Sequence, residues 1–309
     1  MAFPKLKLPT AASLAIANRT LNRARSRSVA LSIQGMSLHY LMTEKRRILD
    51  WGQVPFNPAF LRSGFVADQQ GMAQLIRNLL SKKGYTAMPV IAVFPGFQSI
   101  VRILSLPKAG DVKPATVLPR EARRLMAYAE NEQYLFWNKV VGGEGNSYAV
   151  IAVPRVPLQN FLGMLKTAGI APARVELAPL CLVRSLGQGN AIVANVEADS
   201  IDICIVVNSL PALVRSLWLG DELLSADTAA DRVAEELQNT ISFYNDANPA
   251  NPLSPSLAVH LAGVFPVDEL SPIVARETGH PVLPLLPPVT APEGFSPAAM
   301  AIPAGLLLS

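Results

Sequence analysis

The stretch "LSIQGMSLHYL", residues 31–41, decides the first half of the fold. Apolar residues flank Gln34-Gly35 on both sides, which predicts two β-strands joined by a tight turn. A third strand follows near residues 48–54, so residues 28–56 predict an antiparallel meander. Several nucleotide-binding folds begin with a strand–turn–strand unit whose turn surrounds phosphate. The turn at Gly35 is therefore the first candidate site.

A helix and a buried strand follow the meander. Apolar residues recur at helical spacing within residues 67–85, and Gly84 supplies a stop signal. The stretch "MPVIAVFP", residues 88–95, then predicts a buried strand. Strands followed by a helix and another strand indicate an α/β protein.

A separate unit is expected to begin near Gln98. It reads as a strand (residues 98–107), a helix (118–129) with Pro119 in its first turn, two strands joined by the glycine-rich "GGEGNS", and a helix that ends at Gly169. The plan of the N-terminus then restarts at Ile192, with strands, turns and a helix over residues 228–249. A core strand, "LAVHLAG", and a terminal helix containing Pro303 complete the chain.

The composition indicates a folded protein with a large core, because half of the residues are hydrophobic and 16% are charged. No apolar run reaches the length of a membrane span. Cys181 and Cys204 lie in apolar surroundings and predict buried, reduced thiols, which suits a reducing compartment. The three histidines have no spacing typical of a metal site, so structural roles are expected.

Basic residues are concentrated at the N-terminus. Six lysine and arginine residues precede the first acidic residue, Glu44, and define a basic arm over residues 1–27. Such an arm can bind anionic lipid or nucleic acid, can remain solvated, or can serve as a transit peptide. Because no aromatic residues interleave with the basic ones, we expect no nucleic-acid partner. Contact of residues 1–28 with an anionic membrane surface remains an alternative role for the arm.

Several segments together resemble the PilM family, the actin-like cytoplasmic proteins of type IV pilus assembly that are related to FtsA. They are "SIVRILSLP" with "PREARRLM", "SLPALVRSLWLG" leading into "VAEELQNTISFYN", "VHLAG", and the final "SPAAMAIPAGLLL". The resemblance implies an α/β, actin-like (ribonuclease H-like) bilobed fold with an inserted small α/β (SHS2-like) subdomain. The implied divisions are the arm (1–27), a first actin-like subdomain (28–97), the inserted subdomain (98–176) and a second lobe (177–309).

The resemblance also implies a nucleotide site, and its motifs are degenerate here. The family's first turn is of the type Asp-Ile-Gly-Ser-Ser-Ser-x-Lys, whereas this chain has Ser32 for the aspartate, Gln34 for the glycine and His39 for the lysine. The second turn, usually Asp-x-Gly, reads Asn195-Val196-Glu197, and Val264 follows Gly263 where the family has another glycine. What remains of the implied site is Gly35, Ser37, His39 and Gly263. We therefore expect neither ATP nor magnesium as a tightly held cofactor, and no catalytic residue.

In the resembled family, a membrane-anchored partner contributes a short cytoplasmic peptide to a groove between the first and inserted subdomains. Arg102 lies in the unit that borders this groove and is the candidate partner-binding residue. The resemblance thus implies a cytoplasmic scaffold, peripheral at the inner face of the cell membrane, that binds a PilN-like protein of a pilus or secretion machine. The alternative is a nucleotide-switched actin-like ATPase of the same machine.

Overall fold

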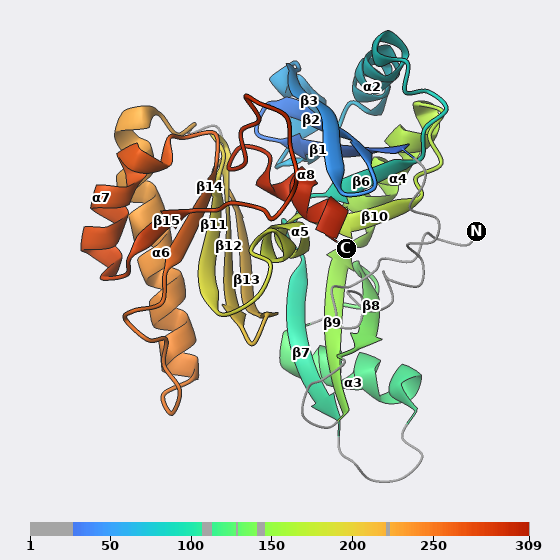
Figure 1. The fold of residues 1–309 in the computed structure, drawn as a ribbon. Helices are drawn as coiled ribbons and strands as arrows, with labels where there is room; N and C mark the ends of the chain where they lie inside the picture. Colours follow the sequence, from blue (N-terminus) through green and yellow to red (C-terminus); the bar gives the residue numbers. More distant parts are fainter. Residues whose placement is uncertain (1–26, 107–112, 128, 141–145, 221–222, 309) are drawn as a thin grey trace.

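The computed structural model describes residues 27–106, 113–127, 129–140, 146–220 and 223–308. Two five-stranded sheets stand side by side, and a three-stranded sheet projects below them (Figure 1). The expected bilobed α/β architecture with a small inserted unit is confirmed. The predicted basic arm lies outside the described residues, apart from Arg27. None of the helices in the described ranges combines the length and the apolarity that a membrane span requires.

The first sheet contains the predicted meander. Its strand order is β10-β6-β1-β2-β3, with β1 to β3 antiparallel and β6 and β10 parallel to β1. Helix α2 begins after Asp68, whose side chain accepts hydrogen bonds from two backbone amides, and ends at Gly84 with φ 72°. Helix α4 packs beside α2. The elements are β1 (Arg27–Gln34), β2 (Ser37–Glu44), β3 (Arg47–Pro55), β6 (Val90–Phe94), β10 (Arg174–Leu177), α2 (Gln69–Lys83) and α4 (Arg155–Thr167).

The second sheet repeats this plan, as the restart of the pattern at Ile192 predicts. Its order is β13-β12-β11-β14-β15, with an antiparallel meander and two parallel strands. Helices α6 and α7 pack on it through an apolar cluster that includes Val233 and Leu270. The elements are β11 (Ala191–Val196), β12 (Ser200–Val207), β13 (Leu210–Trp218), α6 (Ala226–Ala247), β14 (Val259–Gly263), α7 (Val267–Thr278) and β15 (Val282–Pro284).

The inserted unit contains β7 (Ile100–Leu106), α3 (Pro114–Met126), β8 (Gln133–Lys139) and β9 (Asn146–Pro154), with strand order β7-β9-β8. Helix α3 begins at Pro114, so the expectation that Pro119 lies in the first turn is wrong. Pro114 fits the first turn because its missing N–H has no helical acceptor there. Residues 98–176 were assigned to this unit, but pairing with β6 places β10 in the first sheet.

Two short helices join the lobes. Helix α5 (Ala178–Ser185) follows β10 and leads to β11, and α8 (Ala301–Gly305) packs against it, followed by the 3-10 turn η3 (Leu306–Leu308). A Cβ atom added at Gly305 would overlap the carbonyl oxygen of Cys181, so this position admits only glycine. The packing of the two helices therefore requires backbone-to-backbone contact.

Cys181 and Cys204 are both free and buried, as expected.

A buried ion cluster fixes this joint. Glu176 pairs with Arg184 and, at 2.8 Å, with Nε of Arg174. The same two arginines donate to the carbonyl oxygens of Leu306 (2.8 Å) and Gly305 (3.2 Å). Because the Glu176 side chain is fully buried, its charge is compensated only by these arginines.

We predict that Glu176→Gln lowers the free energy of unfolding by about 3 kcal/mol or more, because it leaves two arginines without their buried counter-charge. Urea unfolding followed by circular dichroism measures this. The matched control is Glu44→Gln, which removes the ion pair between Glu44 and Arg27; these side chains are 44% and 54% exposed, respectively. We expect this control to change the free energy of unfolding by less than about 1 kcal/mol. Equal losses of stability in the two variants would contradict the conclusion that the buried ion cluster stabilises the joint.

Candidate functional site

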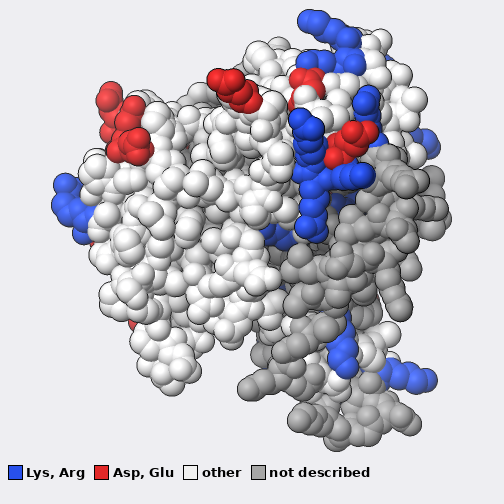
Figure 2. Space-filling view, viewed as in Figure 1, with Lys and Arg blue, Asp and Glu red and all other residues white. Residues whose placement is uncertain are grey.

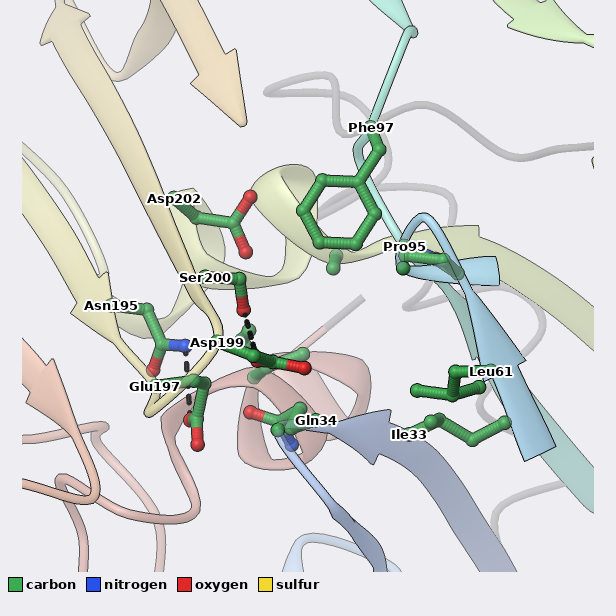
Figure 3. Close-up of a pocket in the computed structure, with 14 residues that line it drawn as sticks. Ile33, Gln34, Leu61, Pro95, Phe97, Asn195, Glu197, Asp199, Ser200 and Asp202 are labelled. Atoms are coloured by element: carbon green, nitrogen blue, oxygen red, sulfur yellow. Dashed lines mark hydrogen bonds between the residues drawn. The ribbon is translucent and has the colours of Figure 1, made fainter. Parts of the chain in front are cut away.

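The turns that correspond to the two implied phosphate motifs meet between the lobes. Gly35 opens the turn from β1 to β2 with φ 54°, a conformation that suits glycine. A Cβ atom at Gly35 would lie 3.2 Å from Oε2 of Glu197, in the turn from β11 to β12, and 4.0 Å from Oδ1 of Asp199. The two turns therefore approach each other between the lobes, and Gln34, which precedes the first turn, lies near Glu197 and Asp199 (Figure 3).

The first turn is a tight hairpin turn. It consists of Gly35 and Met36 alone, because Gln34 already pairs with Ser37 in the strand ladder. Anion-binding loops use several successive backbone N–H groups that face one concavity. A two-residue hairpin offers at most the amides of its two turn residues.

A cavity of about 30 Å³ lies between the lobes beside the two turns. This is room for about two water molecules, whereas ligand pockets have volumes of roughly 300–1,000 Å³. Side chains of Gln34, Asn195 and Glu197 point into it, and Asn195 donates a 3.2 Å hydrogen bond to Glu197 (Figure 3). The chain's own polar side chains line the space between the two turns.

Three carboxyl groups line this cavity, and no lysine or arginine of the described residues does. Burial raises the pKa of Glu197 from 4.5 to about 8, against the lowering effect of the Asn195 hydrogen bond, and the nearby Asp199 and Asp202 raise it further. Burial likewise raises the pKa of Asp202 to about 6 and that of Asp199 above its ordinary value. A polyphosphate would therefore meet acidic groups without any compensating cation.

The other residues of the implied site lie beside the cavity or away from it. His39 pairs with Ser32 across the first hairpin, is fully buried, and has a pKa lowered by burial to about 4. Ser37 is half-buried at the start of β2. A Cβ atom at Gly263, where φ is 115°, would overlap the carbonyl oxygen of Val196, so Gly263 permits two strand ends to approach.

Arg102 lies elsewhere, in a groove of about 440 Å³. Arg102 and Ile103 of β7 form one wall, whereas the other residues that line it belong to the second lobe, in the β12–β13 hairpin and α6. The resemblance implied the first subdomain as the opposite wall. In the described groove the second lobe takes that place.

The chain was compared with known proteins. No protein-family model and no curated protein matches it. Among solved structures, the "PilM-PilN type IV pilus biogenesis complex" has a TM-score of 0.73 at 19% identity and covers 92% of this chain and 98% of that chain. A protein from Bacteroides thetaiotaomicron with "actin-like ATPase fold and unknown function" has a TM-score of 0.52 at 12% identity, covering 94% and 98%. The chain has the actin-like fold.

A second secretion protein shares this actin-like fold. It is the cytoplasmic domain of EpsL, an inner-membrane component of the type II secretion system of Vibrio cholerae, with a TM-score of 0.53 at 12% identity, covering 92% of this chain and 96% of that chain. The likeness extends over both lobes and the inserted unit, because each comparison spans more than nine-tenths of the chain.

Sequence reasoning on the actin-like site missed two of its features. Asp199 and Asp202 lie two and five residues beyond Glu197, and this local run of acidic residues was the available signal. The C-terminal segment also covers the site, since Ile302 lines the cavity and the amide of Gly263 donates to the carbonyl oxygen of Ala298. No pattern in the sequence indicates that contact. Within the described residues, no three histidine, cysteine or carboxylate side chains are arranged to hold a metal ion.

We predict that Glu197 contributes a loss of stability as pH rises from about 4.5 to about 8, and that Glu197→Gln removes this contribution. The folded state binds the Glu197 proton more tightly than the unfolded state does. Protonated Glu197 therefore makes its full contribution to the free energy of unfolding below pH 4.5, and this contribution is lost as the pH rises through about 8. Near pH 8 the variant should be more stable than the native protein by on the order of a few kcal/mol.

Melting temperatures measured across this pH range test the prediction. The matched control is Glu235→Gln on α6, whose side chain is 59% exposed and should leave the slope unchanged. A slope that is the same in the native protein and in Glu197→Gln would mean that Glu197 is already ionised in the folded state.

Proposed function

We propose that this protein is an actin-like scaffold of a type IV pilus or related secretion machine that works without ATP hydrolysis. It would bind the short cytoplasmic tail of a membrane-anchored, PilN-like partner, in the cytoplasm at the inner face of the membrane. The observation that carries this proposal is the filled space between the lobes, where Gly35 contacts Glu197 and the cavity measures about 30 Å³.

The comparisons support the class of machine. One of the similar structures is a complex of PilM with PilN in pilus biogenesis, and another is a cytoplasmic domain from a type II secretion system. The first name describes a pilus biogenesis complex, and the second an inner-membrane component of a secretion system. A fold shared at this level of identity is compatible with the same kind of role, and the site's chemistry argues against an enzymatic one.

The energetic argument against nucleotide binding is cumulative. Ser32 offers no charge where the family's aspartate helps to place magnesium, and His39 is neutral and enclosed where the family has a lysine. Each lost hydrogen bond to a charged group costs roughly 1.5–3 kcal/mol. Opening the lobes would also separate the Gly35–Glu197 contact and expose the apolar joint around α5 and α8. These costs together favour a nucleotide-free protein.

The basic arm supplies a proposed link to the membrane. Lysine and arginine side chains also lie over the first lobe on the face shown in Figure 2, with acidic side chains among them, while the second lobe presents few charges in that view. Basic residues near an anionic surface contribute roughly 1 kcal/mol each. Sedimentation with phosphatidylserine-containing vesicles, with and without residues 1–26, tests the link; unchanged binding after truncation would exclude the arm.

We predict that calorimetry with ATP and magnesium gives no saturable heat, which corresponds to a dissociation constant weaker than about 1 mM. The variant Glu197→Gly removes the carboxyl group that contacts the first turn and is the appropriate comparison. Saturable micromolar binding by the native protein would contradict the proposal and favour the alternative, a nucleotide-switched ATPase of the same machine.

A further inference from the structure

One end of the first lobe brings together a hairpin turn and two helix ends. Strands β1, β3, β6 and β10 begin at this end and β2 ends there, because β6 and β10 run parallel to β1 whereas β2 is antiparallel to β1 and β3. Helices α2 and α4 finish at the same end, since the chain passes from α2 into β6 and from α4 into β10 through short connections. The β2–β3 turn therefore lies at the same end as the last turns of α2 and α4.

The charged side chains at this end are mostly cationic, and together they define what we call the basic end. Its exposed lysine and arginine residues are Arg27, Lys45, Arg46, Arg47, Lys82, Lys83 and Lys166. The described carboxylates at this end are Glu44, which pairs with Arg27, Asp50, which pairs with Lys83, and Glu293, on the segment that pairs with Arg47. Seven cations thus lie among three carboxylates.

This excess is local to the basic end. The whole chain has a net charge of +4, and residues 1–26 contribute five lysine and arginine residues without an acidic one, so the chain from residue 27 onward has a net charge of −1. Figure 2 shows lysine and arginine side chains over the first lobe and few charges over the second. The fold therefore gathers positive charge at one end of a nearly neutral body.

The β2–β3 turn carries three adjacent cations. Lys45, Arg46 and Arg47 follow one another and form no ion pair with another described residue. The turn itself does not call for them, because tight hairpin turns favour asparagine, aspartate and glycine. Lys45 has φ 59°, a conformation that glycine adopts at lower cost. Lysines in the last turns of α2 and α4 suit the helix dipole, but no such role explains the turn. Its charges are available to an external anion.

The basic arm joins the fold beside this turn. Strand β1 begins at Arg27, whose side chain pairs with Glu44, the residue before Lys45. Residues 1–26 therefore enter the described fold next to the β2–β3 turn. Their sequence combines its five basic residues with leucine, isoleucine and phenylalanine. The arm and the turn thus place their charges at the same end of the first lobe.

We propose that the basic end is a membrane-contact surface in which Lys45, Arg46 and Arg47 bind the headgroups of anionic lipids alongside the basic arm. Its place at the inner face of the membrane rests on the proposed function. The residues of the basic end line neither of the two cavities described above, so they suit a plane of phosphate groups. Apolar residues among basic ones, as in the arm, are typical of segments that bind the lipid interface, which favours lipid over nucleic acid.

This contact orients the molecule on the bilayer. Strand β6 begins at the basic end and leads from its other end into β7, so the inserted unit is attached at the far end of the first sheet (Figure 1). The inserted unit therefore points away from the membrane when the basic end binds it.

The test is sedimentation of the full chain with vesicles that contain phosphatidylserine and with vesicles of phosphatidylcholine alone. The double variant Lys45→Glu, Arg46→Glu should bind the anionic vesicles at least about tenfold more weakly than the native protein. The matched control is Arg120→Glu, Lys139→Glu, which changes the net charge equally on exposed residues of the inserted unit and should bind like the native protein. Circular dichroism verifies that each variant is folded.

Removal of residues 1–26 separates the turn from the arm. The truncated chain should bind more weakly but keep a phosphatidylserine-dependent interaction that salt weakens and that Lys45→Glu, Arg46→Glu abolishes. Equal binding of the native protein and the double variant would overturn the turn as a contact and leave the proposed arm link in place. Absence of binding by the native protein would overturn the membrane contact as a whole, while the proposed scaffold and its partner would stand.

Fluorescence energy transfer tests the orientation. Cys181 and Cys204 are buried, so a thiol-reactive dye labels an introduced cysteine selectively. Transfer to acceptor-labelled lipid should be stronger from Thr86→Cys, at the basic end, than from Ala115→Cys on α3, and both positions are exposed. Equal transfer from the two positions would overturn the proposed surface. Tighter binding of the native protein to a short DNA duplex than to the vesicles, lost in the same double variant, would overturn lipid in favour of nucleic acid.

Discussion

The buried pairing of Glu176 with Arg174 and Arg184 is the interaction on which the arrangement of the lobes depends. Arg174 and Glu176 belong to an edge strand of the first sheet, Arg184 to the helix between the lobes, and both arginines hold carbonyl oxygens at the end of the chain. Charges buried to this extent are stable only when every partner is present. The cluster therefore ties three distant segments into one joint.

A joint of this kind makes the space between the lobes part of the core. Gly35 meets Glu197, and a Cβ atom at Gly96 would overlap Oγ of Ser216, so both contacts bring backbone from one lobe against side chains of the other. The carboxyl groups that close the cavity are held with raised pKa values by burial. Such packing leaves a cavity of about 30 Å³ beside the two turns.

Prediction from the sequence succeeded where structure is local. Alternating strands around Gly35 and the helical spacing before Gly84 indicated β1, β2 and α2 correctly. It failed where a local signal had two readings. Pro119 suits a first turn, but Pro114 suits it equally well and begins the helix. Strand β10 follows α4, which itself follows the strands of the inserted unit in sequence, and only the parallel pairing of β10 with β6 assigns it to the first sheet.

The sequence by itself determined the order of the elements, the repeat of the meander and the loss of acidic and glycine residues from both turns, because these depend on residue types and on spacings of two to four residues. The tertiary structure alone decided that Glu197 closes on Gly35, that His39 is enclosed, and that Arg102 faces the second lobe. Such contacts join residues as far apart as Arg174 and Leu306, 132 positions along the chain. No local pattern encodes them, since they form only when the whole chain has closed around its core.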